Sequence, residues 1–157
     1  MTKPALMLLY STFARIACLQ RTACDLRMLQ DSAERARSLP ASEAWHRKVA
    51  AHAQFHCLLA DASGAPAFAL LARFVSGSMH DMIALAGPAA EDMIIASRRR
   101  LLGHLEMRDA DGAAQEMDDY LTRLYCAAAQ TAKVTPQSRR LQQLGHSGLD
   151  QPEELAS

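Results

Sequence analysis

Aromatic residues and net charge are both scarce in this sequence of 157 residues. Phe, Trp and Tyr make up 5% of the chain, whereas hydrophobic residues as a class make up 50%. Alanine and leucine are abundant, which favours helices packed on helices over a sheet rich in Val, Ile and Tyr. The 17 Lys and Arg residues balance the 17 Asp and Glu residues. The chain therefore has no net positive field of the kind that attracts nucleic acid or anionic lipid.

Cysteine pairs, a signal peptide and long hydrophobic runs are also missing. The four cysteines are Cys18, Cys24, Cys57 and Cys126, and none belongs to a Cys-X-X-Cys pair. We expect reduced thiols in the cytoplasm and no disulfide framework. The most apolar early stretch, Ala5 to Leu9, is far too short to span a bilayer. The sequence therefore predicts a soluble protein with no membrane segment.

Apolar residues recur at three-to-four spacing along most of the chain, which is the pattern of amphipathic helices. The stretches that show it are 4–19, 22–39, 42–63, 66–87, 90–108 and 109–132. Pro4 and Pro66 suit first helical turns, and Thr22, Ser42 and Asp109 can cap the helices that follow them. Because the connecting stretches are short, we expect an all-α, antiparallel bundle of about six helices.

The helical pattern ends near Lys133, so residues 1–132 form the predicted helical domain. The stretch that follows holds Pro136, Gly145, Gly148 and Pro152 among mostly polar residues. It cannot bury enough apolar area to offset chain entropy. We expect residues 133–157 to form a disordered tail.

A pair of histidines, His52 and His56, lies in the third predicted helix. The two residues are one turn apart, so both imidazoles project from the same face. Two nitrogen donors on one turn can bind a metal ion or a carboxylate. Such a pair also arises often by chance on an amphipathic helix, and the spacing alone does not choose between these ligands.

Several spaced motifs around this pair resemble the ligand-sensing FCD domain of FadR-type GntR transcriptional regulators. They are Phe55-His56, the turn Ser63-Gly64-Ala65-Pro66, the helix Ser97-Arg98-Arg99-Arg100-Leu101-Leu102, the cap Arg108-Asp109 and the closing stretch Met117-Asp118-Asp119-Tyr120-Leu121. Their order and spacing match the family pattern over roughly residues 13–125. In place of Ala65, relatives often have Asn.

The resemblance implies a six- or seven-helix antiparallel bundle with a central cavity, which dimerises and binds a metabolite that controls an attached winged-helix domain. The matching motifs begin near the start of the chain. We therefore expect DNA contact only through a winged-helix domain that this chain lacks. A fragment, a gene that has lost its DNA reader and a stand-alone sensor all remain open.

The family's frequent metal site uses an acid and three histidines. Those positions correspond here to His52 for the acid, and to His56, Arg98 and Tyr120 for the histidines. Imidazole can replace a carboxylate around zinc or nickel, but a guanidinium stays protonated. At an effective dielectric near 20, it repels a divalent ion about 4 Å away by roughly 8 kcal/mol. We expect no cofactor, with a zinc or nickel centre at His52 and His56 as the alternative.

The same four residues suit an anion. Arg98 offers a fork of donors to a carboxylate, while His52, His56 and Tyr120 add further hydrogen-bonding groups. We therefore expect these residues to bind a small organic acid or acyl ligand in the bundle cavity of a homodimeric sensor. The plainer alternatives are that Arg98 to Arg100 form a solvated helix face and that Tyr120 is an ordinary core aromatic. On the last predicted helix, Glu116 is expected on the outer face.

Catalysis is not expected from this sequence. Ser63 lies in no strand-turn-helix elbow, and Cys57 lacks an activating neighbour. A third hypothesis is an interaction protein without a small ligand, which pairs through the apolar segment Phe68 to Ile83 with itself or with a full-length regulator.

Overall fold

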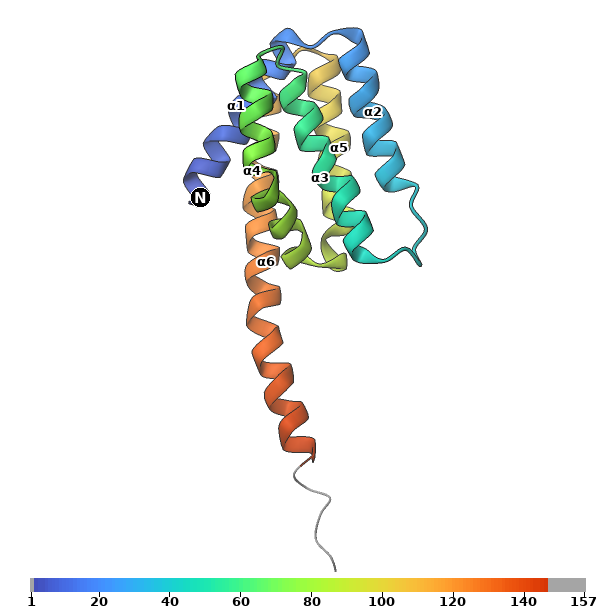
Figure 1. Ribbon diagram of the computed structural model, residues 1–157, viewed down its shortest axis with the longest axis vertical. Helices are drawn as coiled ribbons and strands as arrows, with labels where there is room; N and C mark the ends of the chain where they lie inside the picture. The colour runs from blue at the N-terminus through green and yellow to red at the C-terminus, as the bar shows by residue number, and fades with distance from the viewer. Residues whose placement is uncertain (1, 147–157) are drawn as a thin grey trace, which may run out of the picture.

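The computed structural model describes residues 2–146, with side chains for residues 2–134, and this part of the chain contains helices and no β-strand. The helices are α1 (Lys3–Gln20), α2 (Ala23–Arg37), α3 (Trp45–Asp61), α4 (Pro66–Ala86), the short 3-10 helix η1 (Pro88–Ala90), α5 (Glu91–Glu106) and α6 (Ala110–His146). Along the chain, α2 to α6 run alternately down and up in Figure 1. The predicted all-α bundle is confirmed.

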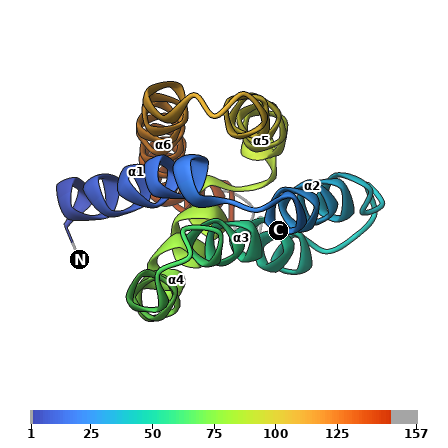
Figure 2. The same ribbon diagram turned by 90° about the horizontal axis from the view of Figure 1, so that it is seen from above.

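The helices form one bundle in which α1 and α4 both pack against α6. Helix α3 packs against α4 on one side and α2 on the other, and α5 packs against α6 and α2. Figure 2 shows α2 at one edge of the bundle, while α1 runs across it toward the opposite edge. Helix α2 is thus a peripheral element that covers the space between α3 and α5.

Buried side chains from all six α-helices form one continuous core. Its largest fully buried members are Leu6, Tyr10, Phe13, Leu29, Phe55, Leu59, Met79, Ile83, Ile94, Leu101, Leu105 and Tyr120. Burying one such apolar side chain stabilises the fold by roughly 1.5–3 kcal/mol before conformational entropy is subtracted. The rings of Tyr10 and Phe13 meet edge to face, with centroids 5.5 Å apart. This core fixes the positions of the helices that carry the candidate site.

Helix starts follow local chemistry at two positions and depart from it at a third. Thr22 and Asp25 form a reciprocal capping box at α2. Asp109 Oδ1 accepts from Gly112 N at 3.0 Å, as expected of an N-cap for α6. The prediction that Ser42 caps the third helix was wrong, because α3 begins at Trp45 after an Ala44 cap without a side-chain hydrogen bond. Ser42 lies instead in a turn closed by Glu43 N and Pro40 O, 2.9 Å apart.

Helix α6 continues to His146, past the boundary at residue 132 that the sequence predicts. Stretches such as Leu141 to Leu144 contain good helix formers, and each residue added to an existing helix gains a backbone hydrogen bond. Of the predicted disordered tail, residues 147–157 lie outside the described part of the chain. In Figure 1, the last turns of α6 extend beyond the other helices.

Glu116 is buried, contrary to the prediction of an outer-face position. Its side chain is 7% exposed and accepts hydrogen bonds from Ser97 at 2.7 Å, Arg100 at 2.8 Å and Arg123 at 2.9 Å. These bonds lower the pKa of the Glu116 carboxyl against the opposing effect of burial. The carboxylate joins α5 to α6 next to Arg98, which directly follows Ser97.

Helix α4 is, within the described residues, the one helix long and apolar enough to cross a membrane by length and composition. In the bundle, one side of it packs against α3 and α6. The buried residues of that side include Val75, Met79 and Ile83. The core of the bundle therefore accounts for only part of the apolar character of α4, because several apolar side chains on its outer side are exposed.

Candidate functional site

The four residues singled out from the sequence come together in the interior of the bundle. His52 and His56 lie on α3, Arg98 on α5 and Tyr120 on α6, and their side chains are 2%, 1%, 3% and 0% exposed. Arg98 is in the middle of the group. The interpretation of Arg98 as part of a solvated helix face is therefore wrong, whereas Arg99 and Arg100 do have exposed side chains.

The guanidinium of Arg98 is held by neutral groups on two other helices. Its Nη2 atom lies 3.2 Å from Nε2 and 3.4 Å from Nδ1 of His56, and it donates to the Tyr120 hydroxyl at 3.3 Å and to the His52 carbonyl at 3.5 Å. The central carbon of the guanidinium lies 4.5 Å from the ring centroid of Phe55 and 4.7 Å from that of Tyr120. Phe55 therefore serves as a cation–π partner as well as a packing residue.

Three nitrogen atoms in this group are buried without a hydrogen-bond partner. They are Nε and Nη1 of Arg98 and Nε2 of His52. Among the residues whose side chains the structure describes, no carboxylate forms an ion pair with Arg98. Buried arginines almost always pair with an acid, because isolating a charge from water is costly. The site thus presents an unbalanced positive charge with unused donors.

Both histidines are neutral at neutral pH. Burial, followed by the nearby Arg98 charge, lowers the pKa of His52 to about 4, although Glu91 opposes the shift. The same two causes lower the pKa of His56 well below its ordinary value. The His56 ring stacks on Tyr120 with centroids 5.7 Å apart, and Tyr10 meets it edge to face at 5.2 Å. The positive charge of the site therefore resides on Arg98.

A second pair of charges borders His52. Lys48 Nζ lies 2.9 Å from Glu91 Oε2, and Lys48 is 7% exposed. The other Glu91 oxygen lies 3.7 Å from His52 Nε2, which is longer than a hydrogen bond. Because Lys48 already neutralises Glu91, this carboxylate does not balance Arg98. The sequence analysis missed this pair, whose members are far apart in the chain and on different helices.

A pocket of about 190 Å³ opens beside these groups, between α2, α3 and α5. Arg98, His52, Arg99, Ile95 and Leu102 line it from α3 and α5, and Gln30, Ala33, Glu34 and Arg37 line it from α2. His56 and Tyr120 support Arg98 from behind and are not in the pocket wall. The α2 residues were not anticipated, since no sequence motif marks them. The predicted central cavity stays a prediction.

The residues present do not fit the metal site that the family resemblance implies. A guanidinium nitrogen lies within 3.4 Å of both ring nitrogens of His56, so a permanent cation is next to the retained imidazole. Within the described residues there is no group of three or more His, Cys, Asp or Glu side chains placed to hold a metal ion. The donors at this site are instead N–H groups, which bind anions.

Comparison with known proteins adds one finding. A family model described as the FCD domain matches residues 5–123. A search of the curated proteins gave no match. The matched range runs from the first turn of α1 into α6 and includes every residue of the Arg98 pocket.

Proposed function

Because the chain belongs to the FCD domain family, we propose that it is the effector-binding domain of a GntR/FadR-like transcriptional regulator. Its ligand is a small organic acid or acyl compound whose carboxylate binds Arg98. The domain acts in the cytoplasm as a homodimer. Promoter recognition belongs to a winged-helix domain and not to this bundle, whose sequence carries no net charge.

The observation that carries this proposal is the buried, uncompensated guanidinium of Arg98. An isolated ion removed from water is destabilising by several kcal/mol, even after relaxation of its surroundings. Only one of its nitrogens, Nη2, has hydrogen-bond partners, and these are neutral. The Nε and Nη1 atoms remain available as two separate donors, on different edges of the guanidinium. A carboxylate can accept a charge-assisted hydrogen bond from either one and balance the charge.

The pocket wall supports a small ligand with an apolar body. Its volume of about 190 Å³ is below the roughly 300–1,000 Å³ of typical drug-sized ligand sites. Ala33 of α2 and Ile95 and Leu102, which flank Arg98 on α5, supply apolar groups in the same wall. His52 Nε2 adds one polar group beside the guanidinium. A short-chain carboxylic acid matches this combination better than a bulky conjugate.

A catalytic role is not part of the proposal. The Ser63 hydroxyl donates to the Ala60 carbonyl at 2.6 Å and accepts from Ala65 N at 3.3 Å, so it serves the turn between α3 and α4. Burial raises the pKa of the Cys57 thiol, which keeps it protonated and weakly nucleophilic at neutral pH.

Calorimetry and thermal-shift measurements with acetate, butyrate, succinate and citrate test the proposal, with butyramide as an uncharged match for butyrate. We expect at least one acid to stabilise the wild-type protein and butyramide to have no effect. Arg98→Met abolishes the stabilisation, whereas Arg35→Ala, at an exposed position of α2 outside the pocket, preserves it. An acid that stabilises the wild type and Arg98→Met equally would exclude Arg98 from the site.

A zinc or nickel centre at His52 and His56 is the competing hypothesis from the metal class. Elemental analysis of protein purified without a tag tests it directly. Stoichiometric metal that is lost in His56→Ala would favour this hypothesis, and a metal-free protein that binds an acid would reject it.

A further inference from the structure

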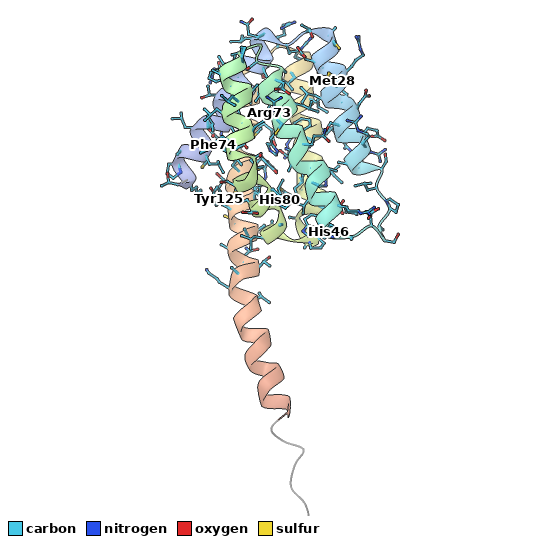
Figure 3. All side chains as sticks on the ribbon, in the orientation of Figure 1. Met28, His46, Arg73, Phe74, His80 and Tyr125 are labelled. Atoms are coloured by element: carbon cyan, nitrogen blue, oxygen red, sulfur yellow. The ribbon has the colours of Figure 1, made fainter. Side chains whose placement is uncertain are left out.

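The outer side of α4 exposes a group of apolar side chains that do not contribute to the core of the bundle. Phe74 is 85% exposed, Leu70 71% and Leu85 57%, and Leu71 is 38% exposed beside them. Their spacing places Leu70, Phe74 and Leu85 on the side opposite the buried residues of the helix. Figure 3 labels Arg73, Phe74 and His80 along this helix. In the part of the chain that the structure describes, no other element covers this face.

Contiguous apolar surface of this kind marks a contact with a partner or with lipid. Charged residues within the face distinguish a protein partner from lipid. Arg73 and Asp81 both lie among its exposed positions, and their side chains are 62% and 78% exposed. Buried in acyl chains, two such charges would be strongly unfavourable. The same two charges are favourable in contact with a protein surface that presents an opposite charge to each of them.

The distribution of these residues along α4 has the symmetry of a self-complementary surface. Arg73 and Asp81 lie equally far from Gly77, on opposite sides of it. Two copies of α4 that run antiparallel and cross at Gly77 therefore bring Arg73 of each copy level with Asp81 of the other. The interface then contains two equivalent ion pairs. Leu70 then meets Ala84 and Leu85. A twofold interface requires this reciprocity, in which one patch contacts itself.

Gly77 suits the crossing point. It is exposed, and a Cβ atom added there would meet nothing within 4 Å, so a second helix can approach closely. A groove of about 340 Å³ between α3 and α4 adjoins it, with Ala53, Cys57, Gly77 and His80 in its wall. The groove lies on one flank of the crossing point, and helical spacing places Phe74 on the other flank, with Ser78 and Asp81. A twofold axis keeps each flank on its own side, so Phe74 of the partner copy packs level with His80 and beside Asp81.

We propose that the chain forms a twofold dimer through antiparallel α4 helices that cross at Gly77, with reciprocal Arg73–Asp81 ion pairs and Phe74 of each copy packed against α4 of the other. This inference rests on the proposed function and deepens it by identifying the dimer surface. The interface lies on the opposite side of α3 from the pocket beside His52. Its failure would leave binding of acids at Arg98 intact.

Charge exchange provides the first test, by sedimentation velocity across a concentration series. We expect the wild-type protein to be a dimer and Arg73→Asp or Asp81→Arg alone to weaken it by about tenfold or more, because each variant places like charges together twice. The double variant restores the dimer to within about threefold. Asp61→Asn, which removes the 3.4 Å contact of Arg73 with Asp61 in its own chain, is the matched control and leaves the dimer unchanged.

Two further variants guard against a loss of fold and test the register. Phe74→Ser yields a folded monomer with the helix content of the wild type, since the ring is 85% exposed and lies outside the core. Its Tm no longer depends on protein concentration, whereas that of the wild-type dimer does. Gly77→Cys, in a chain whose exposed Cys24 and Cys126 are replaced by serine, forms an intermolecular disulfide on oxidation, and Gly103→Cys on α5 does not.

Several results would overturn the inference. They are a monomeric wild-type protein, a dimer that survives Phe74→Ser, a double charge variant that is no better than the singles, or a Gly77→Cys dimer that does not cross-link on oxidation. Binding of the wild-type protein to phosphatidylcholine–phosphatidylglycerol vesicles that is lost in Phe74→Ser would instead assign the face to a membrane. Titration with the organic acids on the same samples reports separately on the Arg98 site.

Discussion

At the scale of single residues, replacing Arg98 by methionine separates its effect on stability from its effect on ligand binding. Methionine is similar in length and can contact Phe55 and Tyr120 through its sulfur. It carries no charge, and so it removes the uncompensated ion in the ligand-free protein. We expect the ligand-free variant to be more stable by about 1 kcal/mol or more, which raises Tm by roughly 2–4 °C. Calorimetry without added acid measures this, and a lower Tm would mean that neutral partners already satisfy the guanidinium.

The two buried imidazoles make stability depend on pH. Their pKa values in the fold are lowered from an ordinary 6.5, to about 4 for His52 and well below the ordinary value for His56. Below pH 6.5 the unfolded chain binds protons that the folded chain does not, so the stabilisation is complete above 6.5 and decreases as the pH falls toward 4. Each imidazole contributes up to about 1.4 kcal/mol per pH unit in this window.

Urea unfolding at pH 7.0, 6.0 and 5.0 checks this dependence. His52→Asn should flatten the slope by about one proton per molecule. Confining the series to pH 5 and above keeps the carboxylates mostly out of the measurement. A stability that is constant between pH 7 and 5 would show that the imidazoles are hydrated in the folded protein.

At the scale of helices, two glycines on neighbouring helices are predicted to respond in opposite directions to alanine. A Cβ atom at Gly112, in the first turn of α6, would collide with the side chains of Asp109 and His104, which form the cap of that helix. A Cβ atom at Gly103, inside α5, would meet nothing within 4 Å. We expect Gly112→Ala to destabilise the fold by about 0.5–2 kcal/mol, the usual cost of losing a helix cap, and Gly103→Ala to stabilise it by roughly 0.5–1 kcal/mol. Thermal unfolding that shifts both variants the same way would contradict the cap geometry.

Helix positions could be predicted from the sequence wherever local chemistry decides them. The capping box of Thr22 and the cap by Asp109 require only neighbours in the chain, and the structure has both. Ser42 and Glu116 show where this reasoning stops. Ser42 has the right side chain for a cap, but the turn that begins at Pro40 delays the helix. Glu116 looks like a surface acid until α5 brings Ser97 and Arg100 to it.

The candidate site was predicted only in part, for a similar reason. Helical spacing alone unites His52 with His56. The addition of Arg98 and Tyr120 came from the family resemblance, because no periodic pattern relates residues on three helices. The pocket wall on α2 could not be predicted, since Ala33 and Arg37 enter it only through the packing of that helix on α3 and α5.

At the scale of the whole molecule, the helices differ in how many large buried side chains anchor them in the bundle. Helix α2 packs chiefly on α3 and α5, and its buried residues are Leu29, Ser32 and Ala36. Helices α1 and α6, in contrast, pack against each other and contribute large residues to the core, including Tyr10, Phe13 and Tyr120. Local opening is easiest where few apolar contacts must be broken. Because α2 forms one wall of the pocket, its opening gives a ligand access to Arg98.

Hydrogen exchange can detect this opening and its control by ligand. We expect the amides in the middle of α2 to exchange faster than those in the middle of α1, α3, α5 and α6 in the ligand-free protein. If opening of α2 releases the ligand, the acid that gives the largest thermal shift, added at about 100 times its Kd, should slow exchange in α2 by about 100-fold, equivalent to 2.7 kcal/mol. Amides near the described end of α6, which lie far from the pocket, should not respond. Arg98→Met is the control and should show no slowing. Unchanged exchange in α2 at saturating acid would mean that the bound ligand makes no stabilising contact with the α2 wall of the pocket.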